Sequence, residues 1–295
     1  MIQLHNCDNL ELMRTLPDES IDVICIDPPY LYLKNQKLER PFDEPKFFEE
    51  CKRLLTKDGF IIMFGRGVSF YRWNCILDSL GFTFKEEIVW DKKYTSSPMT
   101  RLSRIHETVS IFSKGNGSIN KIKVPYEEIR TIYDIDKVIN DVNRLKSTFN
   151  NEKTFNYVLN YINGNRTDLE ENKRAANFNA TLNTKILGSQ TVSPMIAIKE
   201  GMKEKSIIHL NRNHYNTIHP TQKPVRLIER LLDLVIPQGK ERKDIVVADW
   251  FGGSMSTMEA VYNMGMQGIA TEIDEEYFLA GKERIEKLQT QQKLF

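Results

Sequence analysis

Cysteine and histidine are scarce in this chain, which has four cysteines and five histidines among 295 residues. No two cysteines form a Cys-x-x-Cys pair and the histidines are scattered, so no metal-binding spacing is present and we expect no metal. Cys25 lies within an apolar run. This pattern favours buried free thiols in a reducing compartment over disulfide bonds.

Long apolar runs are also absent. No stretch reaches the roughly 20 apolar residues that a membrane-spanning helix needs. Residues 1–5 lack the charged start and the apolar core of a secretory leader. We therefore expect a cytoplasmic protein without a membrane partner.

Neither sign of charge dominates, because the formal net charge is only +1. Binding to nucleic acid through a global basic excess is therefore excluded, and any such contact must come from local basic patches. A small-molecule substrate suits this charge balance equally well. The chain is 40% hydrophobic, so its size allows one large α/β domain with an insertion, or two domains.

Apolar runs and amphipathic stretches alternate through most of the chain. We expect strands at residues 21–26, 60–64, 87–90, 108–112, 245–248 and 268–271. Helical spacing occurs in residues 47–55, 68–80, 225–235 and 254–264, and after Asp274. The alternation predicts an α/β fold in which a parallel or mixed sheet has helices on both faces.

Residues 114–214 differ in character from the rest. They contain 16 Lys and Arg against 11 Asp and Glu, together with 16 Asn, and their apolar positions are sparse. Residues 129–149 and 155–162 nevertheless have helical patterns. We interpret 114–214 as an inserted, mostly helical region, and residues 1–113 and 215–295 as the two parts of one domain.

The segment Asp27-Pro28-Pro29-Tyr30 follows the first buried strand directly. The prolines end the strand, because they cannot donate to a sheet ladder, and they leave backbone carbonyls free. A carboxylate, a carbonyl and an aromatic ring thus meet at the carboxyl end of a strand, where open α/β sheets bind ligands. This set suits a flat base with an exocyclic amino group, although it is also typical of an ordinary turn.

A second loop, Asp249-Trp250-Phe251-Gly252-Gly253-Ser254, lies between a strand and a helix, and Glu272 ends the next strand. Small residues let a backbone approach a ligand, and the acid can accept from ribose hydroxyls. The loop matches neither the GxGxxG dinucleotide fingerprint nor a Gly-Lys-Ser/Thr phosphate loop. A ligand with ribose and no pyrophosphate therefore fits better than NAD or ATP, and a tight turn beside a solvated acid is the alternative.

Together these segments resemble the amino-group (N6-adenine/N4-cytosine) DNA methyltransferases that use S-adenosyl-L-methionine. Residues 27–30 match the family's catalytic motif, and residues 219–224, His-Pro-Thr-Gln-Lys-Pro, are close to identical with its cofactor motif. Residues 249–256 are similar to its glycine-rich loop. The catalytic motif comes first, which resembles the permuted subgroup (beta class) with residues 114–214 as target-recognition region.

The resemblance implies a Rossmann-like methyltransferase fold and a site-specific enzyme that methylates the N6 amine of adenine in a flipped-out base of double-stranded DNA. The implied catalytic residues are Asp27, Pro28, Pro29 and Tyr30. The implied cofactor-binding residues are Asp8, His219, Thr221, Gln222, Lys223, Asp249, Phe251, Gly252, Gly253, Ser254 and Glu272. A homodimer and a restriction endonuclease partner are both open.

Some assignments stay open between alternatives. The acid at position 27 resembles enzymes acting on adenine, with cytosine N4 as the alternative. Met255 replaces a family glycine near the methionine end of the cofactor, where it would crowd the ligand. A further alternative is therefore a DNA-binding homologue with weakened cofactor binding. Methylation of a protein or RNA amine or amide, and a Rossmann dehydrogenase, are two more.

Basic residues follow the strand expected at 87–90. Such residues suit phosphate contacts, which position DNA without specifying its sequence. The candidates are Lys92, Lys93, Arg101 and Arg104. An ordinary solvated loop is the alternative interpretation of this stretch.

Overall fold

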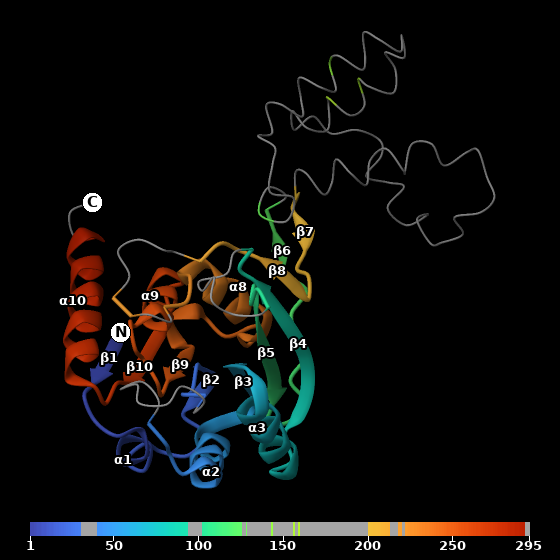
Figure 1. Ribbon diagram of the computed structural model, residues 1–295. Helices are drawn as coiled ribbons and strands as arrows, with labels where there is room; N and C mark the ends of the chain where they lie inside the picture. The colour runs from blue at the N-terminus through green and yellow to red at the C-terminus, as the bar shows by residue number, and fades with distance from the viewer. Residues whose placement is uncertain are drawn as a thin grey trace. The chain divides into compact units, whose positions relative to one another are not determined.

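Figure 1 shows the protein as a computed structural model, which describes residues 1–30, 40–93, 102–125, 200–212, 218–219 and 222–292, and the single residues 128, 143, 156 and 159. The chain divides into two compact units. One consists of Met1–Lys121 and Lys205–Phe295, and the other of Ile122–Glu204. These limits lie inside those expected for the insertion at 114–214.

The first unit contains an eight-stranded sheet in the order β1-β10-β9-β2-β3-β5-β4-β8. Its strands are β1 (Ile2–His5), β2 (Ile21–Ile26), β3 (Leu55–Gly65), β4 (Thr83–Asp91), β5 (His106–Ser113), β8 (Ile207–His209), β9 (Val246–Asp249) and β10 (Gln267–Thr271). β5 runs antiparallel to β3 and β4, and all other neighbours are parallel. The carboxyl ends of the parallel strands therefore meet at one edge of the sheet, together with the amino end of β5.

Helices lie on both sides of the sheet (Figure 1). One group consists of α1 (Asn9–Met13), α2 (Glu44–Leu54) and α3 (Gly67–Ser79). The other consists of α8 (Val225–Val235), α9 (Ser256–Asn263) and α10 (Glu275–Gln292), and the 3-10 turn η2 (Arg242–Asp244) leads into β9. The predicted α/β fold with a mixed sheet is confirmed.

The central strand β2 explains the apolar run in its sequence. All six of its residues are buried. Ile24 and Ile26 join a core cluster with α1, α2 and α3, which includes the fully buried Trp73. Because side chains alternate along a strand, Val23 and Cys25 face the side of α8 and α9. Burial on both faces accounts for an unbroken apolar run in place of an alternating pattern.

Several boundaries differ from the prediction. β3 begins at Leu55, because Ile21 pairs with Leu55 before a register shift leads to the pair Val23–Phe60. β1 was not predicted from the sequence, since this edge strand is only partly buried and lacks an apolar run. Asp274 caps α10 as predicted, accepting hydrogen bonds from the backbone N–H groups of Glu276 and Tyr277.

In the second unit, β6 (Lys123–Val124) pairs antiparallel with β7 (Met202–Lys203). Lys123 Nζ also lies 2.6 Å from Glu200 Oε2. The helices predicted at 129–149 and 155–162 lie outside the described residues, apart from positions 143, 156 and 159, which are helical. The role of this region in target recognition stays a prediction.

Two further findings concern the described part of the chain. All four cysteines are free as expected; Cys25 and Cys51 are buried, but Cys7 is partly exposed and Cys75 is exposed, so the expected burial is wrong for these two. No helix in the described segments combines the length and apolarity needed to cross a bilayer.

Candidate active site

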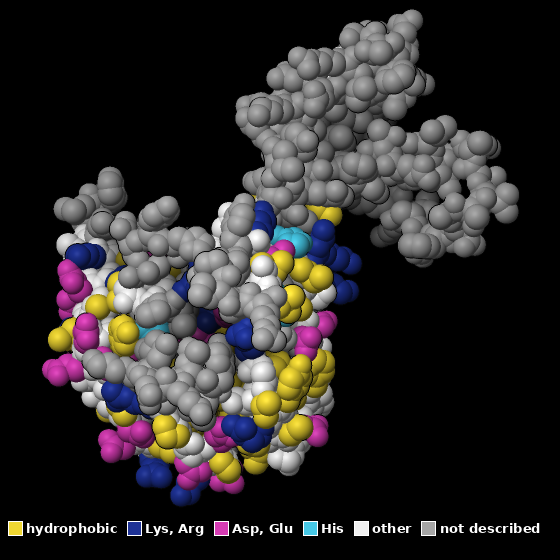
Figure 2. All heavy atoms as spheres, in the orientation of Figure 1, with side chains coloured by type: hydrophobic (Ala, Val, Ile, Leu, Met, Phe, Trp, Pro, Cys, Tyr) yellow, Lys and Arg dark blue, Asp and Glu magenta, His cyan; other side chains and the backbone are white. Residues whose placement is uncertain are grey.

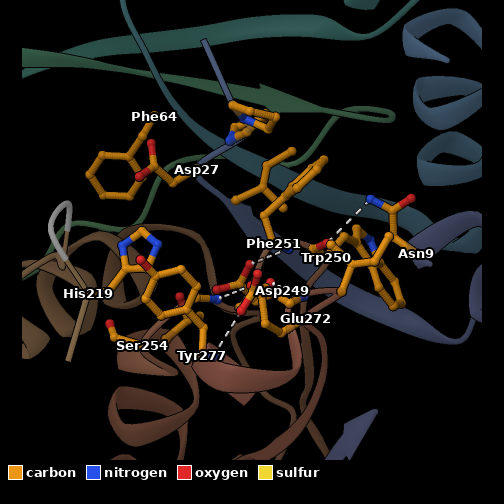
Figure 3. A pocket seen from close by; sticks show the side chains of 18 of the residues that line it. Asn9, Asp27, Phe64, His219, Asp249, Trp250, Phe251, Ser254, Glu272 and Tyr277 are labelled. Atoms are coloured by element: carbon orange, nitrogen blue, oxygen red, sulfur yellow. Dashed lines mark hydrogen bonds between the residues drawn. The ribbon is translucent and has the colours of Figure 1, made fainter. Parts of the chain in front are cut away.

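A pocket of about 200 Å³ is formed by residues that follow the parallel strands (Figure 3). Each of four strands contributes a side chain just beyond its carboxyl end, namely Asp8 after β1, Asp27 after β2, Trp250 after β9 and Glu272 after β10. The pocket therefore lies where open α/β sheets bind ligands.

The structure brings the two predicted motifs together in this pocket. Its lining contains every predicted catalytic and cofactor-binding residue that the structure describes. Thr221 lies outside the described residues. The sequence analysis missed Arg40, Phe42, Phe64, Thr257 and Tyr277, which also line the pocket. Arg40 and Phe42 precede α2, and the other three lie at ordinary strand or helix positions, so no pattern in the sequence marked them.

The Asp27 carboxylate is held at both oxygens. Tyr30 Oη donates to Oδ1 at 2.6 Å, and Lys223 Nζ donates to Oδ2. The Tyr30 backbone carbonyl accepts from Ser69 Oγ at 2.7 Å, which ties the motif to α3. Pro28 is buried beside them. The Asp27 carboxylate and the ring and carbonyl of Tyr30 are thus fixed relative to the sheet.

Lys223 is 7% exposed and lies between two acids. Besides Asp27 it pairs with Glu107 Oε2 at 3.3 Å. Burial favours a neutral amine, yet the carboxylates of Asp27 and Glu107 outweigh it and raise the pKa of Lys223. Lys223 therefore remains charged inside the pocket wall.

The glycine-rich loop is a tight turn held by the next strand. Gly252 N–H donates to the Thr271 carbonyl at 2.8 Å, and Gly253, with φ 49°, donates to Glu272 Oε2 at 2.8 Å. Glu272 Oε1 accepts in turn from Asp274 N–H at 2.8 Å. Glu272 is thus a hydrogen-bonded member of the turn, and burial raises its pKa. Each of its oxygens keeps a lone pair for a ligand.

Asp249 is 5% exposed and ends β9. Burial raises its pKa to about 7, although its hydrogen bonds to Thr257 and to the Phe251 N–H favour the ionised form. The neighbouring charges of Asp27 and Glu272 raise the pKa further. Asp249 therefore has a pKa at which its carboxyl group gains or loses a proton near neutral pH.

The pocket lining carries an excess of acid. Its carboxylates belong to Asp8, Asp27, Asp249, Glu272 and Asp274, against the two cations Arg40 and Lys223. His219 stacks edge-on against Tyr277 with ring centroids 4.4 Å apart, and burial lowers its pKa to about 4, so it is neutral. Such a lining favours a ligand with positive charge. Among the described residues, no group of His, Cys, Asp and Glu is arranged to hold a metal ion.

Met255 lies behind the loop and does not crowd the pocket. It is 0% exposed and is absent from the pocket lining in the described part of the chain. A Cβ at Gly281 of α10 would come within 2.5 Å of Met255 Cγ, and one at Gly252 within 2.8 Å of its Sδ. The thioether therefore fills the space between the loop and α10, outside the described pocket lining.

Met255→Gly is expected to destabilise the fold, although Met255 has a left-handed backbone with φ 57°. Glycine relieves a strain of about 1 kcal/mol. The lost side chain leaves a cavity that costs about 2–5 kcal/mol. Urea unfolding measures the balance, and a higher free energy of unfolding for the glycine variant would contradict the packing role.

The predicted DNA contacts fall into different environments. Lys92 is 8% exposed, and its Nζ donates to Glu107 Oε1 at 2.9 Å, which weighs against a phosphate contact. Lys93 and Arg104 are exposed and lie where β4 ends and just before β5 begins, at the same sheet edge as the pocket. Arg101 lies outside the described residues. Acidic and basic side chains are interspersed over the face in Figure 2, so any DNA contact there is local.

Comparisons with known proteins identify the family of this chain. A sequence model of the DNA methylase family (N6/N4 methyltransferases) matches residues 21–283. The Type II methyltransferase M.HinfI of Haemophilus influenzae is 31% identical over 134 residues, which cover 36% of this chain and 36% of that protein. M.BglII of Bacillus subtilis is 27% identical over 126 residues, covering 38% and 35%. The matched part spans about a third of the length of these relatives.

Solved structures show the same fold over nearly the whole chain. The M1.HpyAVI–SAM complex is 18% identical with a TM-score of 0.55, covering 96% of this chain and 100% of that one. The PvuII DNA methyltransferase (cytosine-N4-specific) is 16% identical with a TM-score of 0.55, covering 95% and 85%. TTHA0409 of Thermus thermophilus, complexed with S-adenosyl-L-methionine, is 16% identical with a TM-score of 0.54, covering 96% and 93%. With the family match across most of its length, this chain belongs to the N6/N4 DNA methylase family.

Proposed function

We propose that the protein is a site-specific DNA methyltransferase that transfers a methyl group from S-adenosyl-L-methionine to N6 of adenine. The observation that carries the proposal is the shared pocket. In it the Asp27–Tyr30 segment after β2 and the Asp249–Ser254 loop after β9 line one cavity of about 200 Å³. An acceptor pair for an amino group thus lies beside a site for a ribose-containing ligand.

The lining fits the cofactor in charge and in hydrogen bonding. S-adenosyl-L-methionine, when bound, supplies a methyl group that its sulfonium makes electrophilic. The acid excess of the lining suits the positive charge of this ligand. Glu272 has lone pairs for ribose hydroxyls, and Asp249 is the buried acid for an ammonium group. M1.HpyAVI and TTHA0409, which share the fold, have structures with this cofactor bound.

The target nitrogen is a weak nucleophile, and side-chain and backbone groups of the protein can activate it. An exocyclic amine has its lone pair delocalised into the base ring. Asp27 accepts a hydrogen bond from one N–H and the Pro28 carbonyl accepts from the other, which favours a pyramidal nitrogen aimed at the methyl donor. The carboxylate also stabilises positive charge as it develops on nitrogen. Tyr30 stacks on the base once its hydroxyl leaves Asp27.

A base inside a duplex does not reach a pocket at the end of a sheet, so the target base must be flipped out. Lys93, Arg101 and Arg104 are the proposed phosphate contacts, and residues 114–214 the proposed target-recognition region. The relatives named as Type II methyltransferases support a restriction–modification role, and a restriction endonuclease partner stays a prediction. A homodimer, a cytoplasmic location and membership of the permuted subgroup stay predictions.

The choice of adenine rests on Asp27, since an acid in place of serine resembles the adenine enzymes. Cytosine N4 offers the same amino group and is the alternative. Met255 is buried and lies outside the described pocket lining, so it does not support the alternative of a homologue with weakened cofactor binding.

The test is mass spectrometry of nucleosides from duplex DNA incubated with the cofactor and the protein, beside Asp27→Ala. We expect N6-methyladenine from the wild type alone. Detection of N4-methylcytosine would support the same mechanism but would assign cytosine, and not adenine, as the target base. No methylated nucleoside, over varied DNA sequences and at high cofactor concentration, would overturn the proposed function.

A further inference from the structure

A chain of buried charged groups runs away from the proposed catalytic acid. Tyr30 Oη and Lys223 Nζ hold the two oxygens of Asp27. Lys223 Nζ also lies 3.3 Å from Glu107 Oε2, and Lys92 Nζ lies 2.9 Å from Glu107 Oε1. We call Asp27, Lys223, Glu107 and Lys92 the charge chain. It alternates in sign and joins the ends of β2, β4 and β5 to the segment before α8.

Three members of the charge chain are well screened from solvent, whereas the side chain of Asp27 is 24% exposed. The side chains of Lys223 and Lys92 are 7% and 9% exposed, and that of Glu107 is 16% exposed. Lys223 Nζ lies 5.0 Å from the centroid of the Phe64 ring, and both residues line the pocket. Buried charges of this kind are costly unless each has a partner, and removal of one partner leaves an uncompensated charge.

We propose that Lys223 and Glu107 are positioning residues for the methyl transfer: Lys223 holds the Asp27 carboxylate in place, and Glu107, backed by Lys92, holds Lys223. This inference rests on the proposed function. It differs from the role implied by the sequence, in which Lys223 binds the cofactor. In the structure its ammonium group contacts the proposed catalytic acid.

The alternating signs predict opposite effects for two substitutions. Lys223→Met removes the cation beside Asp27 and leaves the Glu107 charge behind it. Glu107→Gln removes the acid that competes for Lys223, so the ammonium acts on Asp27 alone. The groups that contact Asp27 or interact with it electrostatically are Tyr30, Lys223, His219, Asp249 and Cys25. Glu107 contacts Lys223, so the two variants change only the cation beside Asp27 and the acid behind that cation.

The first measurement is the single-turnover rate of methyl transfer across pH at saturating cofactor. For Lys223→Met we expect the rate at pH 7 to fall by about tenfold or more. We also expect the acid limb of the pH–rate profile to move to higher pH by about one unit or more. For Glu107→Gln we expect that limb at lower pH. The matched control is Lys240→Met, since Lys240 Nζ pairs with the buried Asp22 at 2.6 Å near the opposite end of β2. This control should leave the limb where it is.

The second measurement is the Kd of S-adenosyl-L-homocysteine. In Lys223→Met we expect this Kd to change by less than about threefold, because Lys223 contacts Asp27 and not the ligand. If Lys223 donated a hydrogen bond to the ligand, its removal would raise the Kd by more than that. A large rise in Kd with an unchanged rate at saturation would assign Lys223 to the cofactor and overturn the proposal. Rate losses in both variants with no shift of the limb would also overturn it. Glu107→Gln decides the question by itself if Lys223→Met does not fold.

A third measurement does not depend on activity. Lys223→Met should lower the melting temperature, and Asp27→Asn added to it should restore part of the loss, because the uncompensated acid is then gone. Additive effects would overturn the pairing on which the proposal stands. If the variants show this coupling but the wild type transfers no methyl group, the proposed function is contradicted and the pairing within the charge chain still stands.

Discussion

Asp27→Asn is expected to lower the single-turnover rate of methyl transfer by about 10²–10⁴-fold. The amide keeps the shape of the side chain, but it carries no charge to stabilise a cationic nitrogen and offers only one acceptor oxygen. Cofactor affinity should change little, since the pocket retains Asp8, Asp249, Glu272 and Asp274. Rapid-quench assays with pre-bound cofactor measure the rate.

Tyr30→Phe is the matched comparison for Asp27→Asn. It removes the 2.6 Å hydrogen bond to Asp27 and keeps the ring that stacks on the base. We expect less than about a tenfold loss, because a single such bond contributes only about 1 kcal/mol. A larger loss from Tyr30→Phe than from Asp27→Asn would contradict the role of the carboxylate as the main acceptor.

Asp249→Asn is expected to weaken cofactor binding by about 10- to 100-fold above pH 8, as the loss of a hydrogen bond to a charged group does. Burial raises the pKa of Asp249 to about 7, and a cationic ligand binds its ionised form. The affinity of the wild type should therefore rise as the pH increases from 6 to 8, whereas that of the variant should not change with pH. Calorimetric titration of the cofactor across this range measures both.

The same substitution should have the opposite effect on stability. A carboxyl group with a raised pKa in the folded state favours folding when it is protonated, so its contribution is lost as the pH rises from about 4 towards 7. Without cofactor, Asp249→Asn should unfold at a higher urea concentration than the wild type at pH 8, and its gain in stability should be smaller at pH 5.

Asp22→Asn, which alters a buried acid near the opposite end of β2, is the control for cofactor binding and should leave that binding unchanged. If the wild type binds the cofactor with an affinity that does not change between pH 6 and 8, the proposed role of Asp249 in binding it is contradicted.

The sequence by itself determined the fold class and both motifs. The apolar run of β2, followed by two prolines, marked the strand end at Asp27, because an unbroken run reflects burial on both faces and proline ends a ladder. The loop after β9 and the acid after β10 were equally visible, since parallel strands place their carboxyl ends at one edge. These are local patterns, and local backbone chemistry was enough to interpret them.

Only the tertiary structure decided the partners of each side chain. Lys223 belongs to a motif that resembles a cofactor segment, yet its ammonium group contacts Asp27, which is far from it in the chain. Lys92 looked like a surface cation and is buried against Glu107, and Met255 packs behind its loop. Buried charges and packed side chains take their energy from neighbours brought close by folding, and the spacing of residues along the chain does not contain those distances.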